Sequence, residues 1–484
     1  MAVVRKIAYN VFFNATAKIL ATVLALVSIG FITRYLGRDG FGDYATVLAF
    51  FSFFGSLADL GLYSIATREI SRVGADEKKI MGNVFSLRLF SSLTVFLFSP
   101  LVFFLPYSHE LKIGIIIAAA SFVFSASYSV LNGIFQKYLV MDRVAITELI
   151  GKVIQLSIII LAVKMDWGFS VIISSLLFYM IFNFVVILIL SRKYIRFKIE
   201  IDFDYWKKFL KESLPMGIAV VITFLYFKTD TIMLSMMQSS SDVGIFNAAF
   251  KVIENITFFP AMLIGLILPL TARYIFTDKK KFQNISDKTF KVLLILIIPV
   301  VIGTLFLADG IIRLIGGGGF AESANVLRII IFSLAFIFFG SFFNNVLLAG
   351  NLQKKLMVAL GFCAVFNISL NFYLIPHYSY LGASYTSVFT EMLVASFGFY
   401  LAKKHLKYTP KINNLGGMII SGMAMAAFLF FSQEWNLFLA APASAIVYFA
   451  SLYLTKSISQ EEIKSLFNRD KVQIKEVFPE EPIG

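Results

Sequence analysis

The chain has 484 residues, of which 58% are hydrophobic and only 15% are charged, and its formal net charge is +14. Soluble proteins carry about 25% charged residues, so this composition excludes an ordinary soluble domain. The basic residues lie in short segments between apolar runs, a distribution that does not indicate a nucleic-acid-binding surface.

Long continuous apolar runs recur along the chain and predict an all-α membrane protein, because a lipid-exposed backbone must satisfy its hydrogen bonds within each span. The first predicted span follows Arg5 and Lys6 and is too long for a signal-peptide core. We predict fourteen spans, near residues 8–33, 42–64, 80–105, 112–135, 144–163, 168–190, 213–236, 243–270, 286–308, 322–348, 354–375, 380–402, 414–432 and 436–455.

The loops between these spans alternate in charge. One side holds most of the basic residues, for example Lys78, Lys79 and the run Lys279–Lys281. The opposite side holds only Arg34, Arg38, Lys112, Lys164 and Arg313. Basic loops stay in the cytoplasm, so we expect a multi-pass protein of the cytoplasmic membrane with both termini cytoplasmic.

The longest internal loop, residues 191–212, separates the first six spans from the next six. Residues 196–202 alternate in polarity like a short strand. Residues 204–212 are typical of an amphipathic interfacial helix, with Trp206 and its neighbouring lysines in the headgroup zone. The segment after Lys456 is polar and mixed in charge, and we expect partial disorder there.

A glycine-rich turn between two apolar segments, residues 32–72, has a weaker copy at residues 230–273. Gly42 matches Gly244, Tyr44 matches Phe246, and Arg68 roughly matches Arg273. Such a repeat predicts two similar halves that face each other across a common site.

Several common kinds of site are absent from the sequence. The single cysteine, Cys363, excludes a disulfide framework, and three scattered histidines give no metal-ligand cluster. No Walker-type phosphate loop occurs, so the chain does not hydrolyse ATP through one of its own. The glycine run at residues 316–319 is interpreted as a flexible turn, since no strand precedes it. We expect neither a cofactor nor a metal ion.

Eleven ionisable residues lie inside the predicted spans, where each costs about 2.5–3.5 kcal/mol at a helix centre. For four of them a structural explanation is favoured, either snorkelling to the membrane surface or mutual neutralisation: Arg88, Glu148, Lys152 and Arg328. Six others fall on the two copies of the repeated hairpin and indicate a functional cavity: Lys18, Asp59, Lys228, Asp230, Lys251 and Glu254. Lys251 and Glu254 share one helix face, whereas Lys228 and Asp230 do not. The alternative is a buried ion-pair network that holds the halves together. The eleventh is Glu391.

The sequence resembles the oligosaccharide flippases of the polysaccharide-transport type, within the multidrug/oligosaccharidyl-lipid/polysaccharide (MOP) exporter superfamily. The resemblance spans nearly the whole chain and is less specific for substrate than for superfamily. The motifs that carry it include residues 34–44, Asp59-Leu60-Gly61, residues 68–72, Ser213-Leu214-Pro215, residues 230–234, and Leu314-Ile315-Gly316 leading to Arg328.

The resemblance implies two pseudo-symmetric six-helix lobes, residues 1–190 and 213–402, around a central cavity. Residues 403–455 would form two peripheral helices and residues 456–484 a cytoplasmic tail. The implied activity is to turn a polyprenyl-diphosphate-linked oligosaccharide across the membrane by alternating access, for cell-surface polysaccharide or O-antigen biosynthesis. Its partners would be that substrate, membrane lipids, and a glycan polymerase or glycosyltransferases.

If the resemblance holds, five basic residues are candidates for substrate binding, since lysine and arginine bind phosphate: Lys18, Lys228, Lys251, Arg88 and Lys152. The acids Asp59, Asp230, Glu254 and Glu391 are candidates for coupling or gating. Because three hairpin acids balance three hairpin lysines, the strongly cationic cavity expected of a peptidoglycan lipid II flippase is not supported. A lipid II flippase and a cation-coupled multidrug exporter nevertheless stay open as alternatives. Interior lysines argue against export of cationic drugs, interior charges on a repeat argue against a purely structural protein, and the short outer loops argue against an enzyme.

The charge asymmetry of the loops makes a direct prediction of topology. In a Cys363→Ala background, a membrane-impermeant thiol reagent should label Ser239→Cys in intact cells and leave Asn284→Cys unlabelled. The reverse pattern would overturn the predicted orientation.

Overall fold

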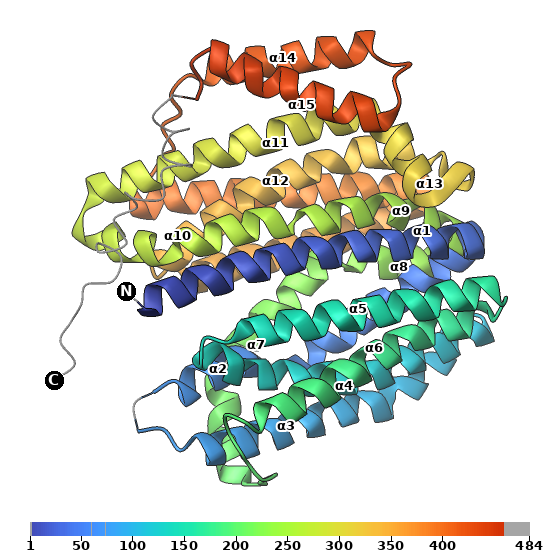
Figure 1. Cartoon of the computed structure of the whole chain (residues 1–484), viewed down its shortest axis with the longest axis vertical. Helices are drawn as coiled ribbons and strands as arrows, with labels where there is room; N and C mark the ends of the chain where they lie inside the picture. The colour runs from blue at the N-terminus through green and yellow to red at the C-terminus, as the bar shows by residue number, and fades with distance from the viewer. Residues whose placement is uncertain (1, 60, 73, 459–484) are drawn as a thin grey trace. The chain divides into compact units, whose positions relative to one another are not determined.

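The computed structural model describes residues 2–59, 61–72 and 74–458, and every regular element in these ranges is a helix (Figure 1). The predicted all-α fold is therefore confirmed. The α-helices are α1 (Ala2–Asp59), α2 (Leu62–Ile70), α3 (Glu77–Phe98), α4 (His109–Lys137), α5 (Met141–Lys164), α6 (Gly168–Ser191), α7 (Phe203–Phe227), α8 (Thr229–Met237), α9 (Ser240–Ile256), α10 (Phe258–Thr277), α11 (Lys279–Gly316), α12 (Ser323–Ala349), α13 (Gln353–Leu401), α14 (Leu415–Phe431) and α15 (Leu437–Leu454).

Eleven helical stretches among the described residues are long and apolar enough to cross a membrane, so the chain is a multi-pass membrane protein. Two of the long helices each contain two predicted spans. Helix α1 changes direction at Gly37 (φ 65°), and α13 changes direction at Ser379 (φ 49°). The predicted total of fourteen spans stays a prediction.

The chain divides into two compact units. Unit 1 comprises residues 1–247, 315–319 and 364–383, and unit 2 comprises residues 248–314, 320–363 and 384–484. The predicted lobe boundaries, 1–190 and 213–402, stay a prediction.

In unit 1, helix α4 packs against α1, α3 and α6, and α5 packs against α1 and α6. The core of this unit gathers large apolar side chains from α2, α3 and α4, including Leu62, Met81 and Phe135. In unit 2, α14 and α15 pack side by side (Figure 1). Tyr448 of α15 is fully buried, and its hydroxyl donates a hydrogen bond to the carbonyl of Ile295 at 3.1 Å.

The segment before α7 differs from its prediction. Residues 196–202 form no strand. They lie along α3, where the amide of Asp202 donates to Oδ1 of Asn83 at 3.0 Å and the hydroxyl of Ser86 donates to the carbonyl of Glu200. This is possible because Gly82 has no side chain; a Cβ there would lie 2.4 Å from the carbonyl oxygen of Lys198. The alternating segment therefore contacts a helix and not another strand.

The predicted interfacial helix is the first part of α7, which continues without a break to Phe227. Trp206 was expected in the headgroup zone, but its side chain is only 8% exposed and packs with Phe209 in the core of unit 1. Part of this helix face thus packs on protein, and its predicted place in the headgroup zone stays a prediction.

Three predicted spans are broken. The second is interrupted between α1 and α2 at Gly61 (φ 70°), the seventh between α7 and α8 at Lys228, and the eighth between α9 and α10 at Thr257. Broken helices leave backbone carbonyl and amide groups without their usual partners, so other groups of the protein must satisfy them.

The two glycines that match in the repeat lie against each other in unit 1. A Cβ on Gly42 would lie 1.7 Å from the carbonyl oxygen of Ser240, and one on Gly244 would lie 2.2 Å from that of Arg38. The neighbouring glycine run joins the end of α11 to a short 3-10 helix, Gly317–Phe320, and its predicted flexibility stays a prediction. Thr33 holds its start by donating to the carbonyl of Ile315 at 2.8 Å.

The glycine contact yields a stability prediction. Gly42→Ala should destabilise the folded protein by about 1–3 kcal/mol, because the added methyl group forces two backbones apart. Gly265→Ala is the matched control, since nothing lies within 4 Å of its Cβ position. The measurement is the thermal melting temperature of each variant in detergent. Equal melting temperatures for the two variants would refute the close helix crossing.

Candidate functional site

A buried carboxylate stands directly after the break in the seventh predicted span. Asp230 is in the first turn of α8, two residues after Lys228, and is only 3% exposed. The positive end of the helix dipole favours a carboxylate at this position. Its Oδ1 accepts hydrogen bonds from Nδ2 of Asn367 at 2.9 Å and of Asn371 at 2.7 Å.

The two asparagines come from the first half of α13, at positions i and i+4, and both are fully buried. Nδ2 of Asn371 also donates to Oδ1 of Asn367 at 3.1 Å, and Oδ1 of Asn371 has no hydrogen-bond partner. An unsatisfied buried carbonyl oxygen is unfavourable. The cluster therefore combines one carboxylate with an amide oxygen that can accept a further donor or cation.

Thr231 and Asn247 extend this polar cluster to α9. The hydroxyl of Thr231 donates to Oδ1 of Asn247 at 3.2 Å, and both side chains are 3% exposed. Asp230 was predicted from the sequence, but Asn367, Asn371 and Asn247 were missed. The signal for the first two was present: two amides four residues apart in an apolar run would lie on one face of a helix.

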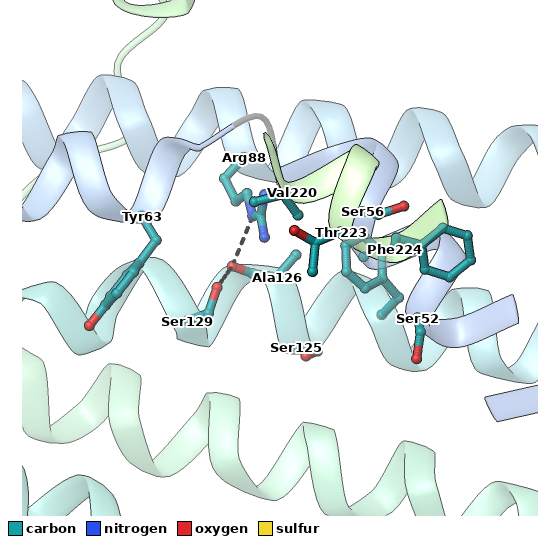
Figure 2. A pocket seen from close by; sticks show the side chains of 12 residues that line it. Ser52, Ser56, Tyr63, Arg88, Ser125, Ala126, Ser129, Val220, Thr223 and Phe224 are labelled. Carbon is teal, nitrogen blue, oxygen red and sulfur yellow. Dashed lines mark hydrogen bonds between the residues drawn. The ribbon is translucent and has the colours of Figure 1, made fainter. Parts of the chain in front are cut away.

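A cavity of about 470 Å³ lies within unit 1, where α1 and α2 meet α4 and α7. Figure 2 shows Arg88 of α3 beside it, with Tyr63 at one end and Ser52 and Phe224 at the other. Six hydroxyl groups line it: Ser52, Ser56, Tyr63, Ser125, Ser129 and Thr223. Phe122 and Phe224 add aromatic rings to the same wall.

Arg88 is only 4% exposed, so it does not snorkel to the membrane surface, and that structural explanation was wrong. Nη1 donates to the carbonyl of Ala58, and Nε donates to that of Ala126 at 3.4 Å (Figure 2). The Ala58 carbonyl belongs to the last turn of α1, where the helix ends and leaves its carbonyls without intrahelical partners. A cation at a helix C-terminus is also favoured by the dipole. Arg88 thus stabilises the break in the second span at the edge of the cavity.

A second group of charges links α1 to α5. The charges of Lys18 and Lys152 both act on the carboxylate of Glu148, so the predicted neutralisation of Glu148 by Lys152 involves a third residue. Nζ of Lys152 donates to Oε1 of Gln155 at 2.9 Å and lies 4.4 Å from the centre of the Tyr179 ring. Lys18 itself is exposed.

The remaining predicted residues occupy separate positions. On α9, Lys251 and Glu254 form an ion pair at 2.7 Å, which confirms that they share a face. Lys228 is the residue at the α7–α8 break, with its Nζ 5.8 Å from the ring centre of Phe227. Glu391 of α13 is buried in unit 2, and its charge acts on Cys363. The side chain of Asp59 lies outside the described residues.

Broken spans with buried ionisable groups at the breaks are typical of membrane transporters. Residues 7–275, more than half of the chain, match the model of the family described as "Polysaccharide biosynthesis protein", and the chain belongs to that family. The MatE model matches residues 215–373. The relationship recognised from the motifs is therefore confirmed.

Curated relatives agree with this assignment. The chain is 25% identical to a putative O-antigen transporter of Shigella flexneri over 79% of this chain and 94% of the relative. It is 24% identical to the capsular polysaccharide biosynthesis protein CapF of Staphylococcus aureus over 56% of this chain and 70% of that protein.

Solved structures show the same fold. The lipid II flippase MurJ in an inward closed conformation aligns with a TM-score of 0.72 and 18% identity, over 94% of this chain and 100% of MurJ. An inward-facing multidrug MATE transporter of the MOP superfamily aligns with a TM-score of 0.65 and 16% identity, over 82% of this chain and 98% of that structure.

The contribution of the ion pair on α9 to protein stability can be tested by mutation. Lys251→Gln should lower the free energy of unfolding by about 1–3 kcal/mol, because it removes the ion pair that Lys251 makes with the partly buried Glu254 carboxylate. The double variant Lys251→Gln/Glu254→Gln should recover most of that loss. The measurement is the melting temperature and folded yield in detergent, and a double variant less stable than Lys251→Gln would contradict the pairing.

Proposed function

We propose that this protein is a flippase that moves a polyprenyl-diphosphate-linked oligosaccharide across the cytoplasmic membrane by alternating access, with both termini in the cytoplasm. The observation that carries the proposal is the cavity beside Arg88. It offers hydroxyl groups, aromatic rings and a buried guanidinium inside a membrane-spanning unit. Membership in the polysaccharide biosynthesis family supports a glycan-linked substrate for such a cavity.

The chemistry of this substrate explains the mixture of groups. Glycan hydroxyls exchange hydrogen bonds with serine, threonine and tyrosine hydroxyls. A diphosphate is bound by arginine through paired hydrogen bonds and by lysine as a point charge. Lys18, Lys152, Lys228 and Lys251 supply such charges along the spans, while the prenyl chain stays in the hydrocarbon of the bilayer. A glycan polymerase or glycosyltransferases would act on the product or supply the substrate.

The Asp230 cluster is proposed as the coupling site. Proton or sodium-ion binding would neutralise the carboxylate, and the ion would also satisfy the unpaired oxygen of Asn371. Because the cluster joins α8 to α13 inside unit 1, its occupancy biases how tightly these two helices are held together. If the ion binds one conformation of the transporter more tightly than the other, its binding shifts the equilibrium between the two conformations.

Two alternatives remain within the superfamily. The similarity to MurJ raises transport of peptidoglycan lipid II, and the MatE match raises cation-coupled multidrug export. The buried guanidinium of Arg88 in the cavity wall disfavours a cationic drug. The experiment that decides is to delete the gene and identify the lipid-linked glycan that accumulates on the cytoplasmic side. Accumulation of an oligosaccharide diphospholipid supports the proposal. Accumulation of lipid II, or drug sensitivity with no lipid intermediate, supports an alternative.

Lys251 gives a complementary test of substrate binding. If its ammonium binds the diphosphate, the variant Lys251→Gln/Glu254→Gln folds but does not complement the deletion, whereas Lys251→Arg keeps substantial transport. Full complementation by the folded double variant would limit the pair to a structural role.

Asp230→Asn tests the coupling site. The amide keeps the shape of the carboxylate but cannot take up a proton or neutralise a cation, so transport in vesicles should be strongly reduced with folded yield retained. Glu434→Gln, in the exposed turn between α14 and α15, is the matched control and should transport normally. Normal, ion-dependent transport by Asp230→Asn would exclude Asp230 as the coupling residue.

A further inference from the structure

Unit 2 carries an apolar groove that the proposed transport function does not use. Two stretches of α13, residues 354–362 and 397–401, lie side by side and enclose about 570 Å³. Val358, Ala359, Phe362, Phe397 and Leu401 form its walls. The rings of Phe362 and Phe397 meet edge to face, with their centres 5.7 Å apart. A groove of this composition accepts hydrocarbon and offers it almost no polar partner.

One end of the same groove is strongly basic. Lys354 and Lys355 line it, and Nζ of Lys404 donates a hydrogen bond at 3.1 Å to the hydroxyl of Tyr400, which also lines it. Nζ of Lys355 contacts the His405 ring at 3.2 Å, which ties the two stretches together. Across residues 2–59, 61–72 and 74–458, no carboxylate forms an ion pair with Lys354, Lys355 or Lys404.

The first two lysines also lie at the start of a helix. Lys354 and Lys355 lie in the first turn of α13, and Leu352, the residue before that helix, provides no side-chain cap. The N-terminus of a helix carries partial positive charge, so lysines there are unfavourable on their own. A bound anion relieves both the charge repulsion and the lack of a cap.

We propose that this groove binds one anionic phospholipid, with its phosphate on Lys354, Lys355 and Lys404 and an acyl chain between Val358, Phe362 and Phe397. The combination of a basic end and an apolar wall matches a molecule with a phosphate at one end and hydrocarbon at the other. These lysines lie on the predicted cytoplasmic side, where anionic lipids attract basic residues next to membrane spans. The proposal holds for a resident lipid and does not depend on which substrate is transported.

The test uses the purified full chain in detergent and native mass spectrometry. Phosphatidylglycerol and phosphatidylcholine with the same acyl chains are added separately, and the bound lipid is counted. Phosphatidylglycerol should bind more tightly. The variant Lys354→Gln/Lys355→Gln should weaken its binding by about fivefold for each lysine removed and leave phosphatidylcholine unchanged. Lys354→Arg/Lys355→Arg should keep the preference.

Two controls separate this site from general effects of charge and folding. Lys207→Gln/Lys208→Gln removes two exposed lysines from α7 in unit 1 and should leave lipid binding unchanged. Ala359→Trp fills the groove and should displace phosphatidylglycerol, while gel filtration checks that the protein stays folded. An equal preference in the wild type and in Lys354→Gln/Lys355→Gln would overturn the proposal. Retention of undecaprenyl phosphate without phosphatidylglycerol would also overturn it, since the groove would then hold a prenyl carrier.

Discussion

A helix that breaks inside a bilayer must satisfy its freed backbone groups from within the protein, and this constraint governs the interior of unit 1. Arg88 meets it at the end of α1 by donating to the carbonyl of Ala58. Asp230 is the reverse case: it is an anion at the start of α8, where the helix dipole favours a negative charge. Arg88 and Asp230 therefore act at breaks, where the backbone provides complementary partial charges.

The same constraint explains which parts of the fold could be predicted. The helical class and the positions of the long apolar runs follow from hydropathy, because only helices satisfy a lipid-exposed backbone. The break at Lys228 lies inside a run that hydropathy treats as continuous. The burial of Trp206 was not predicted for a related reason, since an amphipathic helix packed on protein has the same composition as one on a membrane surface.

For the candidate sites, the charged residues could be predicted from the sequence, but not all of their partners could. Asp230, Lys251 and Arg88 were predicted because a charge in a span is conspicuous. Their partners were not all predictable, because backbone carbonyls such as Ala58 leave no trace in the sequence, and buried asparagines are less costly than charges. Asn367 and Asn371 have a helical spacing, but only the structure pairs them with Asp230 across 137 and 141 residues. Long-range pairing of that kind is a property of the fold rather than of any local pattern.

The Asp230 cluster is built around a single carboxylate. The hydrogen bonds that Asn367 and Asn371 donate to Asp230 bring no formal charge, so one monovalent cation offsets the charge of this carboxylate. A divalent ion carries one positive charge more than the Asp230 carboxylate can offset. Used as a coupling site, it would admit one elementary charge per cycle. The membrane potential would then contribute about 2.3 kcal/mol per 100 mV for a complete crossing, in addition to the concentration gradient of the ion.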